Sequence, residues 1–472
     1  MPSRLQLWIR RAGRLVRLLI ALDFAAVRRR WHGLRDAVPR QLPETLKPVR
    51  IARVVPDAAA ELLRLDTAPG TEGARLPRLL IVVPGLERDG APLSACDLAR
   101  QWQAEGSWQV TVASPRTGPV ADDLARGGVA VEIDPVWQAP SWSPAAHLAG
   151  VAAIRARLAP LRPDTILVMT VDLFAVVEAA AGAGVRSVWN IREGEPWRER
   201  LADRHETVAA HALGCFAAAD AVVFVSQATA RVWQDFCGPD TAVHVIRNAP
   251  QAPAGDQPEC ARSRLRADLG LPQEGFVALC VGTLSQRKGQ IDLIEAVRRL
   301  RRDGVGDVTG ALVGGNGLTP PQHAEWTLMA GEAVVMPGQV AEPACWYAAA
   351  DVLVCASRAE GIPRVSHEAA LCGLPIITTP VGGIAEILTD GESARFYPPG
   401  AVDSLAQLLL QVRADAGLAR RLAAGARAAM ERAGTFDVMA QAYETVLRSP
   451  AQVPAHVVAS QDAGGARVAM AG

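Results

Sequence analysis

Two glutamates stand where a helix is predicted to begin, a setting that suits chemistry on a charged and hydroxylated substrate. Glu360 and Glu368 lie eight positions apart in the run Glu360-Gly-Ile-Pro-Arg-Val-Ser-His-Glu368. Free N–H groups and the helix dipole make such a helix start an anion site. The pattern therefore suits a negatively charged ligand rich in hydroxyl groups. A capping carboxylate followed by a surface carboxylate is the structural alternative.

A lysine in a glycine-rich loop is the second candidate for chemistry. The chain has 49 basic residues, of which only Lys47 and Lys288 are lysines. A lysine kept in such a background points to a site that needs a compact ammonium rather than a planar guanidinium. Lys288 and Arg287 stand in the loop Gly282-Thr-Leu-Ser-Gln-Arg-Lys-Gly289, directly before a predicted helix. This arrangement suits a diphosphate, and a strand-to-helix turn with a solvated Arg-Lys pair is the alternative.

Both candidates are positioned by predicted strand–helix–strand units. The run 351–357 reads as a buried strand, and the helix that follows has Pro363 in its first turn and Gly373 just past its end. A further strand over 375–379 makes the unit parallel. An α/β domain of this kind begins with the strand 275–281. Its loops at 282–289, 314–317, 337–340, 357–363 and 380–384 each follow a strand, so they are expected to form one nucleotide-sized crevice.

The N-terminal half predicts a second α/β domain. An apolar strand over 79–83 precedes the loop Pro84-Gly-Leu-Glu-Arg-Asp-Gly-Ala-Pro92 and a helix over 93–103. Further strands alternate with helical patterns, which indicates a doubly wound sheet. The loop holds no G-x-G-x-x-G, which argues against a nicotinamide dehydrogenase. The run 248–258 is rich in Pro, Ala and Gly and is predicted to link the two domains.

Composition limits the alternatives. A chain of 472 residues has room for two domains of ordinary size, and its formal net charge of zero gives no global reason to expect nucleic-acid binding. The eight cysteines are scattered without a C-x-x-C, so they are predicted to be reduced, structural and cytosolic. No secretory signal is evident.

The first forty residues differ in charge from the rest. They contain ten arginines against Asp23 and Asp36, and residues 5–35 among them show a helical pattern. Its uncharged runs are too short to span a bilayer. A helix lying on an anionic membrane surface is one interpretation. A packing helix, a partner-binding helix and a solvated arm remain the others.

Considered together, these motifs resemble a known enzyme family. VGTLSQRKGQIDLIEAVRRL, VVMPGQV and YAAADVLVCASRAEGIPRVSHEAALCGLPIITTPVGGIAEIL closely resemble the donor domain of family 4 glycosyltransferases. LLIVVPGLERDGAPLSACDLARQW and ADAVVFVSQATARVW resemble its N-terminal domain more loosely. The resemblance covers about 79–447 and is most specific within 281–388.

The resemblance implies the α/β GT-B fold, in which two Rossmann-like doubly wound domains face a central cleft. The basic N-terminal helical extension predicted from the first residues is added to it. The expected parts are the extension over 1–70, an acceptor domain over 71–250, a linker over 251–262, a nucleotide-sugar donor domain over 263–434, a C-terminal helix over 435–448 that packs back on the N-terminal domain, and a disordered tail over 449–472.

The implied function is retaining transfer of a sugar from a nucleotide-diphosphate donor. Lys288 would hold the donor diphosphate and stabilise it as the leaving group. Glu360 would face the sugar near the anomeric carbon, and Glu368 would accept hydrogen bonds from the ribose. Backbone groups at the helix start would reach the sugar and phosphates, namely those of Gly361, Ile362, Pro363, Arg364 and Val365.

Other donor contacts are implied on both sides of the cleft. The loop Gly338 to Val340 would contact the base, and Gly90 would let a phosphate approach the N-terminal domain closely. The donor loop would contribute Gly282, Thr283 and Arg287. No metal and no cofactor is expected, since lysine and the helix start supply positive charge.

Three positions depart from the family pattern. Thr283 stands where the family usually has an arginine, which leaves one phosphate cation missing unless Arg287 reaches in. Arg192 follows the strand 187–191 where many members carry a histidine near the sugar. Asn248-Ala249-Pro250 replaces a more usual Asn-Gly at the hinge.

The same residues are compatible with other functions. A retaining glycosidase would also use paired carboxylates but would not need a lysine-bearing phosphate loop. A nucleotide-sugar epimerase of the same architecture, or a degenerate non-catalytic sugar-nucleotide-binding protein, is the alternative function. The expected partners are a nucleotide-sugar donor and a glycan or lipid-linked acceptor, in envelope glycan or exopolysaccharide synthesis. The expected location is the cytoplasm, with possible peripheral contact to the inner face of the plasma membrane, and no nucleic acid is expected.

Overall fold

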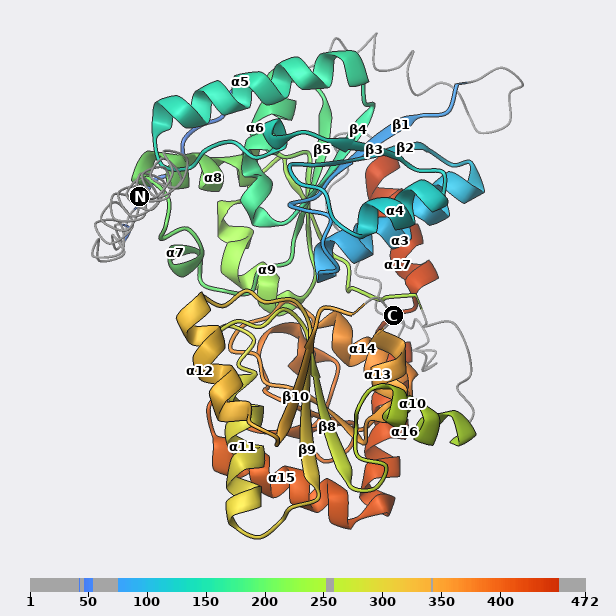
Figure 1. The fold of residues 1–472 in the computed structure, drawn as a ribbon. Helices are drawn as coiled ribbons and strands as arrows, with labels where there is room; N and C mark the ends of the chain where they lie inside the picture. Colours follow the sequence, from blue (N-terminus) through green and yellow to red (C-terminus); the bar gives the residue numbers. More distant parts are fainter. Residues whose placement is uncertain (1–41, 43–45, 54–74, 252–258, 341–342, 450–472) are drawn as a thin grey trace, which may run out of the picture.

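The computed structural model describes residues 42, 46–53, 75–251, 259–340 and 343–449 of the chain. Most of the predicted N-terminal extension (1–70) lies outside the described residues, and so does the predicted tail from residue 450 onward. The described part forms two α/β domains stacked end to end, with the carboxyl ends of both sheets facing each other (Figure 1).

The N-terminal domain is built on a seven-stranded parallel sheet in the order β3-β2-β1-β4-β5-β6-β7. Its strands are β1 (Arg78–Val82), β2 (Gln109–Ser114), β3 (Ala130–Ile133), β4 (Thr165–Met169), β5 (Arg186–Ile191), β6 (Ala221–Phe224) and β7 (Ala242–Val245). Its helices are α3 (Gly90–Glu105), α4 (Val120–Arg126), α5 (Pro144–Leu161), α6 (Phe174–Ala183), α7 (Trp197–Arg200), α8 (Glu206–Ala218) and α9 (Gln227–Trp233), with short 3-10 turns at Pro135–Trp137, Val171–Leu173 and Gln234–Phe236.

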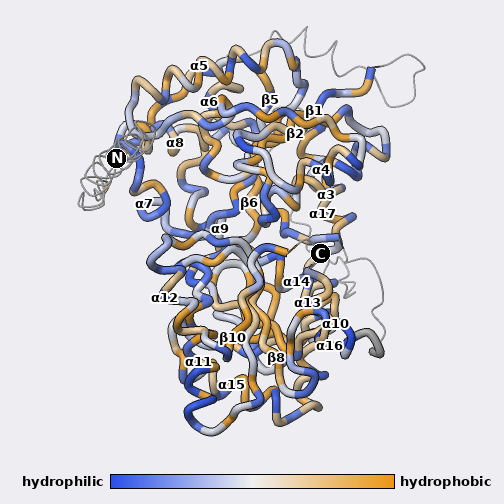
Figure 2. Tube along the Cα trace, in the orientation of Figure 1, coloured by the Kyte–Doolittle hydropathy of each residue, from blue (hydrophilic) through white to orange (hydrophobic). Residues whose placement is uncertain are grey.

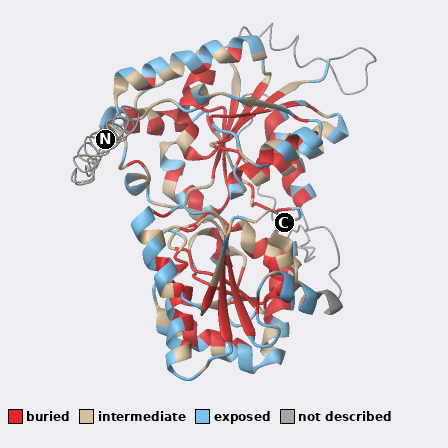
Figure 3. Ribbon diagram, viewed as in Figure 1, coloured by how far each residue is buried: buried red, intermediate tan, exposed pale blue. Residues whose placement is uncertain are grey.

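Helices cover both faces of this sheet. Side chains alternate along each strand, so Leu80 and Val82 of β1 pack with α5, α6 and α8, whereas Leu79 and Ile81 pack with α3. All four are almost fully buried. A strand buried on both faces reads as a continuous apolar run, which is why the run over 79–83 was readable in the sequence. Figures 2 and 3 show the apolar, buried strands at the centre of each domain.

The C-terminal domain repeats this design with a six-stranded parallel sheet in the order β10-β9-β8-β11-β12-β13. Its strands are β8 (Phe276–Val281), β9 (Val308–Val313), β10 (Val334–Gly338), β11 (Val352–Cys355), β12 (Ile376–Thr378) and β13 (Arg395–Phe396). Its helices are α10 (Glu259–Asp268), α11 (Ile291–Arg302), α12 (Pro320–Ala330), α13 (Pro343–Ala349), α14 (Arg364–Leu371), α15 (Val402–Ala414) and α16 (Ala416–Ala433), with a 3-10 turn at Gly382–Glu386.

The last described helix, α17 (Phe436–Arg448), returns to the N-terminal domain. Phe436, Met439 and Tyr443 are buried in the same apolar cluster as α3 and the strands β1 and β2. Arg186 also donates a hydrogen bond of 2.9 Å to the Val446 carbonyl. Figure 1 shows α17 beside α3 in the upper domain, so the chain crosses between the domains twice.

Two elements were not expected from the sequence. The helix α10 begins at Glu259, within the range that was predicted as the linker (251–262). Arg262 and Arg266, one turn apart on α10, both form ion pairs with Asp351 and tie the helix to the start of β11. The edge strand β13 was not predicted, because two residues leave no readable period.

The described residues 46–53 of the predicted N-terminal extension are not helical. They run along α8, where the Val49 amide donates a hydrogen bond of 3.0 Å to the Ala210 carbonyl. A Cβ on Gly214 of α8 would lie 1.9 Å from the Val49 carbonyl oxygen, so only glycine permits this approach. Arg53 pairs with Asp220. This part of the extension therefore belongs to the N-terminal domain. None of the helices in the described part is long and apolar enough to cross a bilayer.

A buried carboxylate links three helices of the N-terminal domain. Glu178 of α6 lies 2.9 Å from His147 Nε2 of α5 and 2.9 Å from His211 Nδ1 of α8. Burial raises the pKa of Glu178, but the hydrogen bonds from the two histidines outweigh it and lower the pKa to about 2. Its ionised form therefore stabilises the fold above the ordinary carboxyl pKa, and this stability is lost as pH falls towards 2.

We expect Glu178→Gln to lower the free energy of unfolding of the N-terminal domain at pH 7 by about 1–3 kcal/mol, because an amide cannot accept from both histidines. Between pH 4.5 and 2, the free energy of unfolding of the variant should also fall less steeply than that of the wild type. Urea unfolding followed by tryptophan fluorescence measures both effects. Glu325→Gln on the exposed face of α12 is the control, and equal stability of the two variants would contradict the assignment.

Candidate active site

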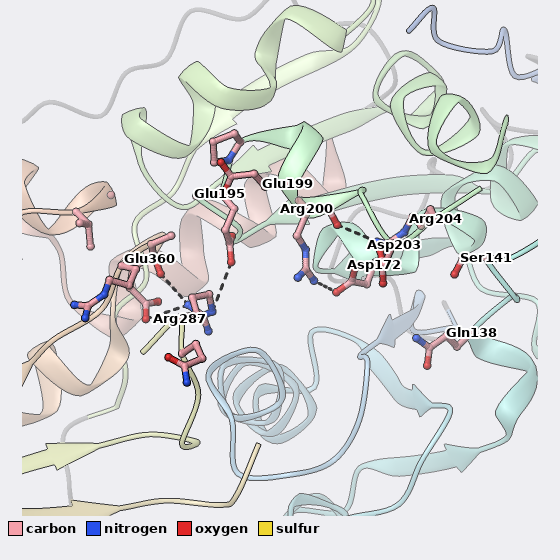
Figure 4. A pocket seen from close by; sticks show the side chains of 17 residues that line it. Gln138, Ser141, Asp172, Glu195, Glu199, Arg200, Asp203, Arg204, Arg287 and Glu360 are labelled. Atoms are coloured by element: carbon pink, nitrogen blue, oxygen red, sulfur yellow. Dashed lines mark hydrogen bonds and ion pairs between the residues drawn. The ribbon is translucent and has the colours of Figure 1, made fainter. Parts of the chain in front are cut away.

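The two domains enclose a cavity of about 1010 Å³ at the carboxyl ends of both sheets. Its upper wall, on the N-terminal domain that lies at the top of Figure 1, includes loops after β4 and β5 and α7, and its lower wall comes from loops after β8, β11 and β12. Figure 4 shows residues of both walls from close by. Open α/β sheets bind ligands at this edge. The lining residues are Gln138, Ser141, Asp172, Gly194, Glu195, Pro196, Glu199, Arg200, Asp203, Arg204, Gln286, Arg287, Arg358, Ala359, Glu360, Val381 and Gly382.

Lys288 and Glu360, predicted from separate motifs, meet at this cavity. Lys288 Nζ lies 2.6 Å from Glu360 Oε1, and the Ser357 hydroxyl donates to the same oxygen at 2.8 Å. The Glu360 residue is only 8% exposed. Burial raises the pKa of Glu360, but Lys288 and Arg287 outweigh it and lower the pKa to about 2. The carboxylate is therefore ionised at neutral pH.

Arg287 connects this cluster to the opposite domain. Its Nη1 lies 3.1 Å from Glu360 Oε1, and its Nε lies 3.5 Å from Glu195 Oε1 on the N-terminal wall. Figure 4 shows Arg287 between the two carboxylates. Burial lowers the pKa of Arg287, and the two carboxylates raise it above its ordinary value. Arg287 therefore lies in the cleft between a carboxylate of each domain.

The conformation of the lysine loop depends on glycine and on Gln290. Gly282 and Gly289 have φ of +139° and +62°, and a Cβ on Gly289 would lie 2.1 Å from the Ala356 carbonyl oxygen. The Gln290 side-chain amide donates to the carbonyls of Gly282 and Thr283 at 3.2 and 3.1 Å. These contacts close the loop on itself and hold Lys288 beside the end of β11.

The loop before α14 places the remaining residues of the glutamate motif. Pro363 precedes the first residue of α14, and Ile362 is 5% exposed. Val365 packs on the apolar cluster beneath α14. A Cβ on Gly361 would lie 2.5 Å from the Arg192 carbonyl oxygen. The start of α14 therefore lies directly against the N-terminal domain.

Glu368 lies one turn along α14 from Arg364 and is already hydrogen-bonded. Tyr347 Oη donates to its Oε2 at 2.8 Å, and Arg364 Nε donates to its Oε1 at 2.7 Å. Arg364 Nη1 also lies 2.7 Å from Asp97 Oδ2 on α3, so this side chain bridges the two domains. The sequence indicated a backbone contact for Arg364 and gave no sign of this bridge. A ribose at Glu368 would share the carboxylate with Arg364 and Tyr347.

Thr283 also faces the opposite domain. Its hydroxyl donates a hydrogen bond of 2.7 Å to Asp89 Oδ1, and Asp89 directly precedes Gly90 at the start of α3. The structure therefore brings Gly90 and the lysine loop together.

Gly338 ends β10 with φ of +82°, and its carbonyl accepts from the Gly314 amide at 2.9 Å. Val340 packs on the apolar cluster next to it.

Several cavity residues were not predicted from the sequence. Asp172 pairs with both Arg200 and Arg204 on the upper wall. Its backbone follows Thr170, a non-glycine residue with φ of +78°, which is strained. None of these residues belongs to a motif with a recognisable spacing. The signal available in the sequence was the group of charged residues after β5, namely Arg192, Glu193 and Glu195 before α7 and Arg198 within it.

A metal-capable group in the described part of the chain is formed by His147, Glu178 and His211, whose ligand atoms all lie within 4.8 Å of one another. These residues come from α5, α6 and α8, whereas the Lys288–Glu360 cluster comes from the cleft loops. The hydrogen bonds from the two histidines satisfy Glu178 without an ion, which is consistent with a structural role of the group.

Comparison with family models matches both halves of the chain. The model described as "Glycosyltransferase Family 4" matches residues 88–249, and the one described as "Glycosyl transferases group 1" matches residues 275–415. The matched segments therefore coincide with the two domains and include the lysine loop and the glutamate motif.

Among curated proteins, a D-inositol 3-phosphate glycosyltransferase of Streptomyces bingchenggensis is 34% identical over 205 residues, which are 39% of this chain and 45% of that protein. A GDP-mannose-dependent alpha-(1-6)-phosphatidylinositol monomannoside mannosyltransferase of Mycolicibacterium smegmatis is 32% identical over 208 residues, 42% of this chain and 54% of that protein. The chain spans about half the length of the curated relatives it matches. These relatives are transferases, which does not favour the epimerase alternative.

Among solved structures, Alr3699/HepE of Anabaena in complex with UDP and glucose superposes with a TM-score of 0.67 at 22% identity, over 79% of this chain and 100% of that chain. WaaG, a glycosyltransferase involved in lipopolysaccharide biosynthesis, gives a TM-score of 0.60 at 17% identity, over 78% and 99% of the two chains. At these identities the likeness shows the fold.

Three observations agree: both family models match, the two parallel sheets are paired, and the cleft between them holds the lysine and the glutamate. The chain belongs to the family 4 glycosyltransferases, the group 1 glycosyl transferases of GT-B architecture.

Proposed function

We propose that this protein is a retaining glycosyltransferase that moves a sugar from a nucleotide-diphosphate donor to a hydroxylated acceptor. The observation that supports this most directly is the cluster of Lys288, Arg287 and Glu360 at the interdomain cavity. Two cations and one ionised carboxylate meet there within 3.1 Å. Such a cluster suits a reaction in which negative charge develops on a departing phosphate while positive charge develops on the sugar.

The proposed roles follow from charge and position. When a diphosphate enters, Lys288 and Arg287 would exchange their contact with Glu360 for contacts with phosphate oxygens. Fixed cations there would lower the barrier to departure of the nucleotide diphosphate. Glu360, freed from part of its pairing, would stabilise the positively charged anomeric centre. We propose that these side chains make a metal ion unnecessary for donor binding.

For the donor, the similar solved structures are described with UDP, with UDP and glucose, or with UDP-glucose, and one curated relative uses GDP-mannose. UDP-sugars and GDP-sugars are therefore the first donors to test. For the acceptor, the upper wall of the cavity is polar, with Asp172, Glu195 and Arg204 among its residues. This lining suits a sugar or another polyhydroxylated group rather than an acyl chain.

For the biological setting, we propose envelope glycan or exopolysaccharide synthesis at the cytoplasmic face of the membrane. WaaG, with the same fold, is described as acting in lipopolysaccharide biosynthesis. The ten arginines of the first forty residues would attract an anionic lipid surface.

The test is a panel of UDP- and GDP-sugars incubated with purified protein, with and without glycan acceptors. We expect at least one donor to be consumed, slowly with water alone and faster with an acceptor, and to give free nucleotide diphosphate. Proton NMR of the product should show the anomeric configuration of the donor. Donor isomerisation without release of nucleotide would indicate an epimerase. No binding and no turnover across the panel would indicate a non-catalytic protein.

A further inference from the structure

Arg192, directly after β5 on the N-terminal side of the cleft, carries a positive charge that is paired with no carboxylate among the described residues. Its Nη1 donates to Asn248 Oδ1 at 2.9 Å and to Asn190 Oδ1 at 3.3 Å. Its Nη2 donates to the Ser94 hydroxyl at 3.2 Å and to the Gly90 carbonyl at 3.3 Å. All four acceptors are neutral. In the described part of the chain, no carboxylate pairs with this guanidinium.

The two carboxylates that interact electrostatically with Arg192, those of Glu193 and Glu360, have other hydrogen-bond or ion-pair partners. Glu193 Oε2 accepts the backbone amides of Val171 and Arg192, at 3.0 Å each. Glu360 is shared between Lys288 and Arg287. Charged groups that lose water are normally paired, because an uncompensated charge is costly. Arg192 thus holds a half-buried charge that an anionic ligand could neutralise.

The surroundings of Arg192 are those of the proposed donor site. Gly90 begins α3, and a Cβ there would lie 3.8 Å from Arg192 Nη2. The preceding residue, Asp89, is hydrogen-bonded to Thr283 of the lysine loop. The Arg192 carbonyl lies against Gly361, at the approach to α14. The guanidinium therefore stands next to two loops that converge on the site, and it comes from the opposite domain to Lys288.

We propose that Arg192 binds an anionic group of the donor, either a phosphate of the nucleotide diphosphate or a carboxylate on the transferred sugar. The inference rests on the proposed function and adds a donor-binding residue to it. On binding, Nη2 would exchange its contacts with Ser94 and Gly90 for anionic oxygens, because a guanidinium presents a planar set of donors that matches both phosphate and carboxylate. Because Thr283 supplies no charge in the lysine loop, Arg192 supplies a cation from the other wall of the cleft.

The experiment measures affinity by titration calorimetry for uridine, UDP, UDP-glucose and UDP-glucuronate, with the guanosine nucleotides in parallel. Arg192→Gln removes the charge, and Arg192→Lys keeps it. We expect Arg192→Gln to bind the anion-bearing ligand about 10- to 100-fold more weakly and Arg192→Lys to lose less. If the anion is the diphosphate, UDP and UDP-glucose weaken and uridine does not. If it is the sugar carboxylate, only UDP-glucuronate weakens.

Two control variants separate anion binding from a structural role. Asn248→Ala removes a hydrogen-bond partner of Arg192 but no charge, and it should leave affinity within about threefold. Arg264→Gln removes a charge from exposed α10 and should change nothing. Arg192→Gln binding every ligand as the wild type does, or Asn248→Ala reproducing its loss, would overturn the proposal while the proposed function stands. A wild-type protein that binds none of the nucleotides would overturn both.

Discussion

Lys288→Ala is expected to lower the rate of sugar transfer by about two to three orders of magnitude, with a smaller effect on donor KM. A preorganised charge aimed at a developing negative charge contributes on this scale. Lys288 Nζ is held 2.6 Å from Glu360 Oε1 by a loop whose glycines and Gln290 fix its course. The charge is therefore in place before the donor arrives, and the binding energy need not be used to order it.

The matched control is Lys47→Ala. Lys47 is the only other lysine of the chain, and it is exposed on the segment that runs along α8. It should keep full activity. kcat and KM are measured with the donor identified in the panel, and the unfolding temperature is recorded for each variant. Transfer by Lys288→Ala within about fivefold of the wild type would refute the leaving-group role.

The architecture was readable in the sequence because parallel strands buried on both faces form unbroken apolar runs. The strand 79–83 and the unit over 351–379 are examples, and they differ from β1, β11, α14 and β12 by one or two residues at their ends. The lysine loop and the glutamate motif were also readable, because their glycines and charged residues follow strands directly. Their meeting at the cleft follows from parallel topology, which brings the carboxyl ends of neighbouring strands to one edge.

Contacts between the domains could not be read in this way. The Asp97–Arg364–Glu368 bridge joins residues 267 positions apart, and no local pattern marks either end. The same holds for Glu386, which caps the start of α9 through the amides of Gln227 and Ala228. Such contacts depend on how the two domains are placed relative to each other. Sequence periodicity describes one element at a time and contains no information on that placement.

For Arg192, the sequence revealed the unusual residue but not the groups that surround it. Its departure from the family pattern was visible in the sequence, but the meaning of the departure was not. Only the structure reveals that its four hydrogen-bond acceptors are neutral. Asn248, which matches the family pattern directly before the departing Ala249, is one of them.

Gly194→Ala is expected to lower kcat/KM by about 100-fold while leaving each domain folded. Gly194 lies on the loop after β5, and a Cβ there would lie 2.3 Å from the Glu360 carbonyl oxygen in the opposite domain. Neither atom can move aside as the end of a flexible side chain could, because the oxygen belongs to the backbone and a Cβ is bonded directly to it. The domains would separate or the loop would shift, and Glu360 would lose its position against Lys288 and the donor. Displacements of about 1 Å at a catalytic centre can cost this much activity.

Gly306→Ala provides the matched control for Gly194→Ala, since a Cβ at exposed Gly306 meets nothing within 4 Å and its backbone is not left-handed. It should keep full activity and the wild-type unfolding temperature. Because Gly194 lies at the contact between the domains, its alanine variant should lose activity with a shift of only a few degrees in that temperature. Small-angle scattering should show a larger radius of gyration for Gly194→Ala if the domains separate. Full activity of Gly194→Ala would mean that turnover does not require the Gly194–Glu360 contact, and the closed cleft would then not be the reactive state.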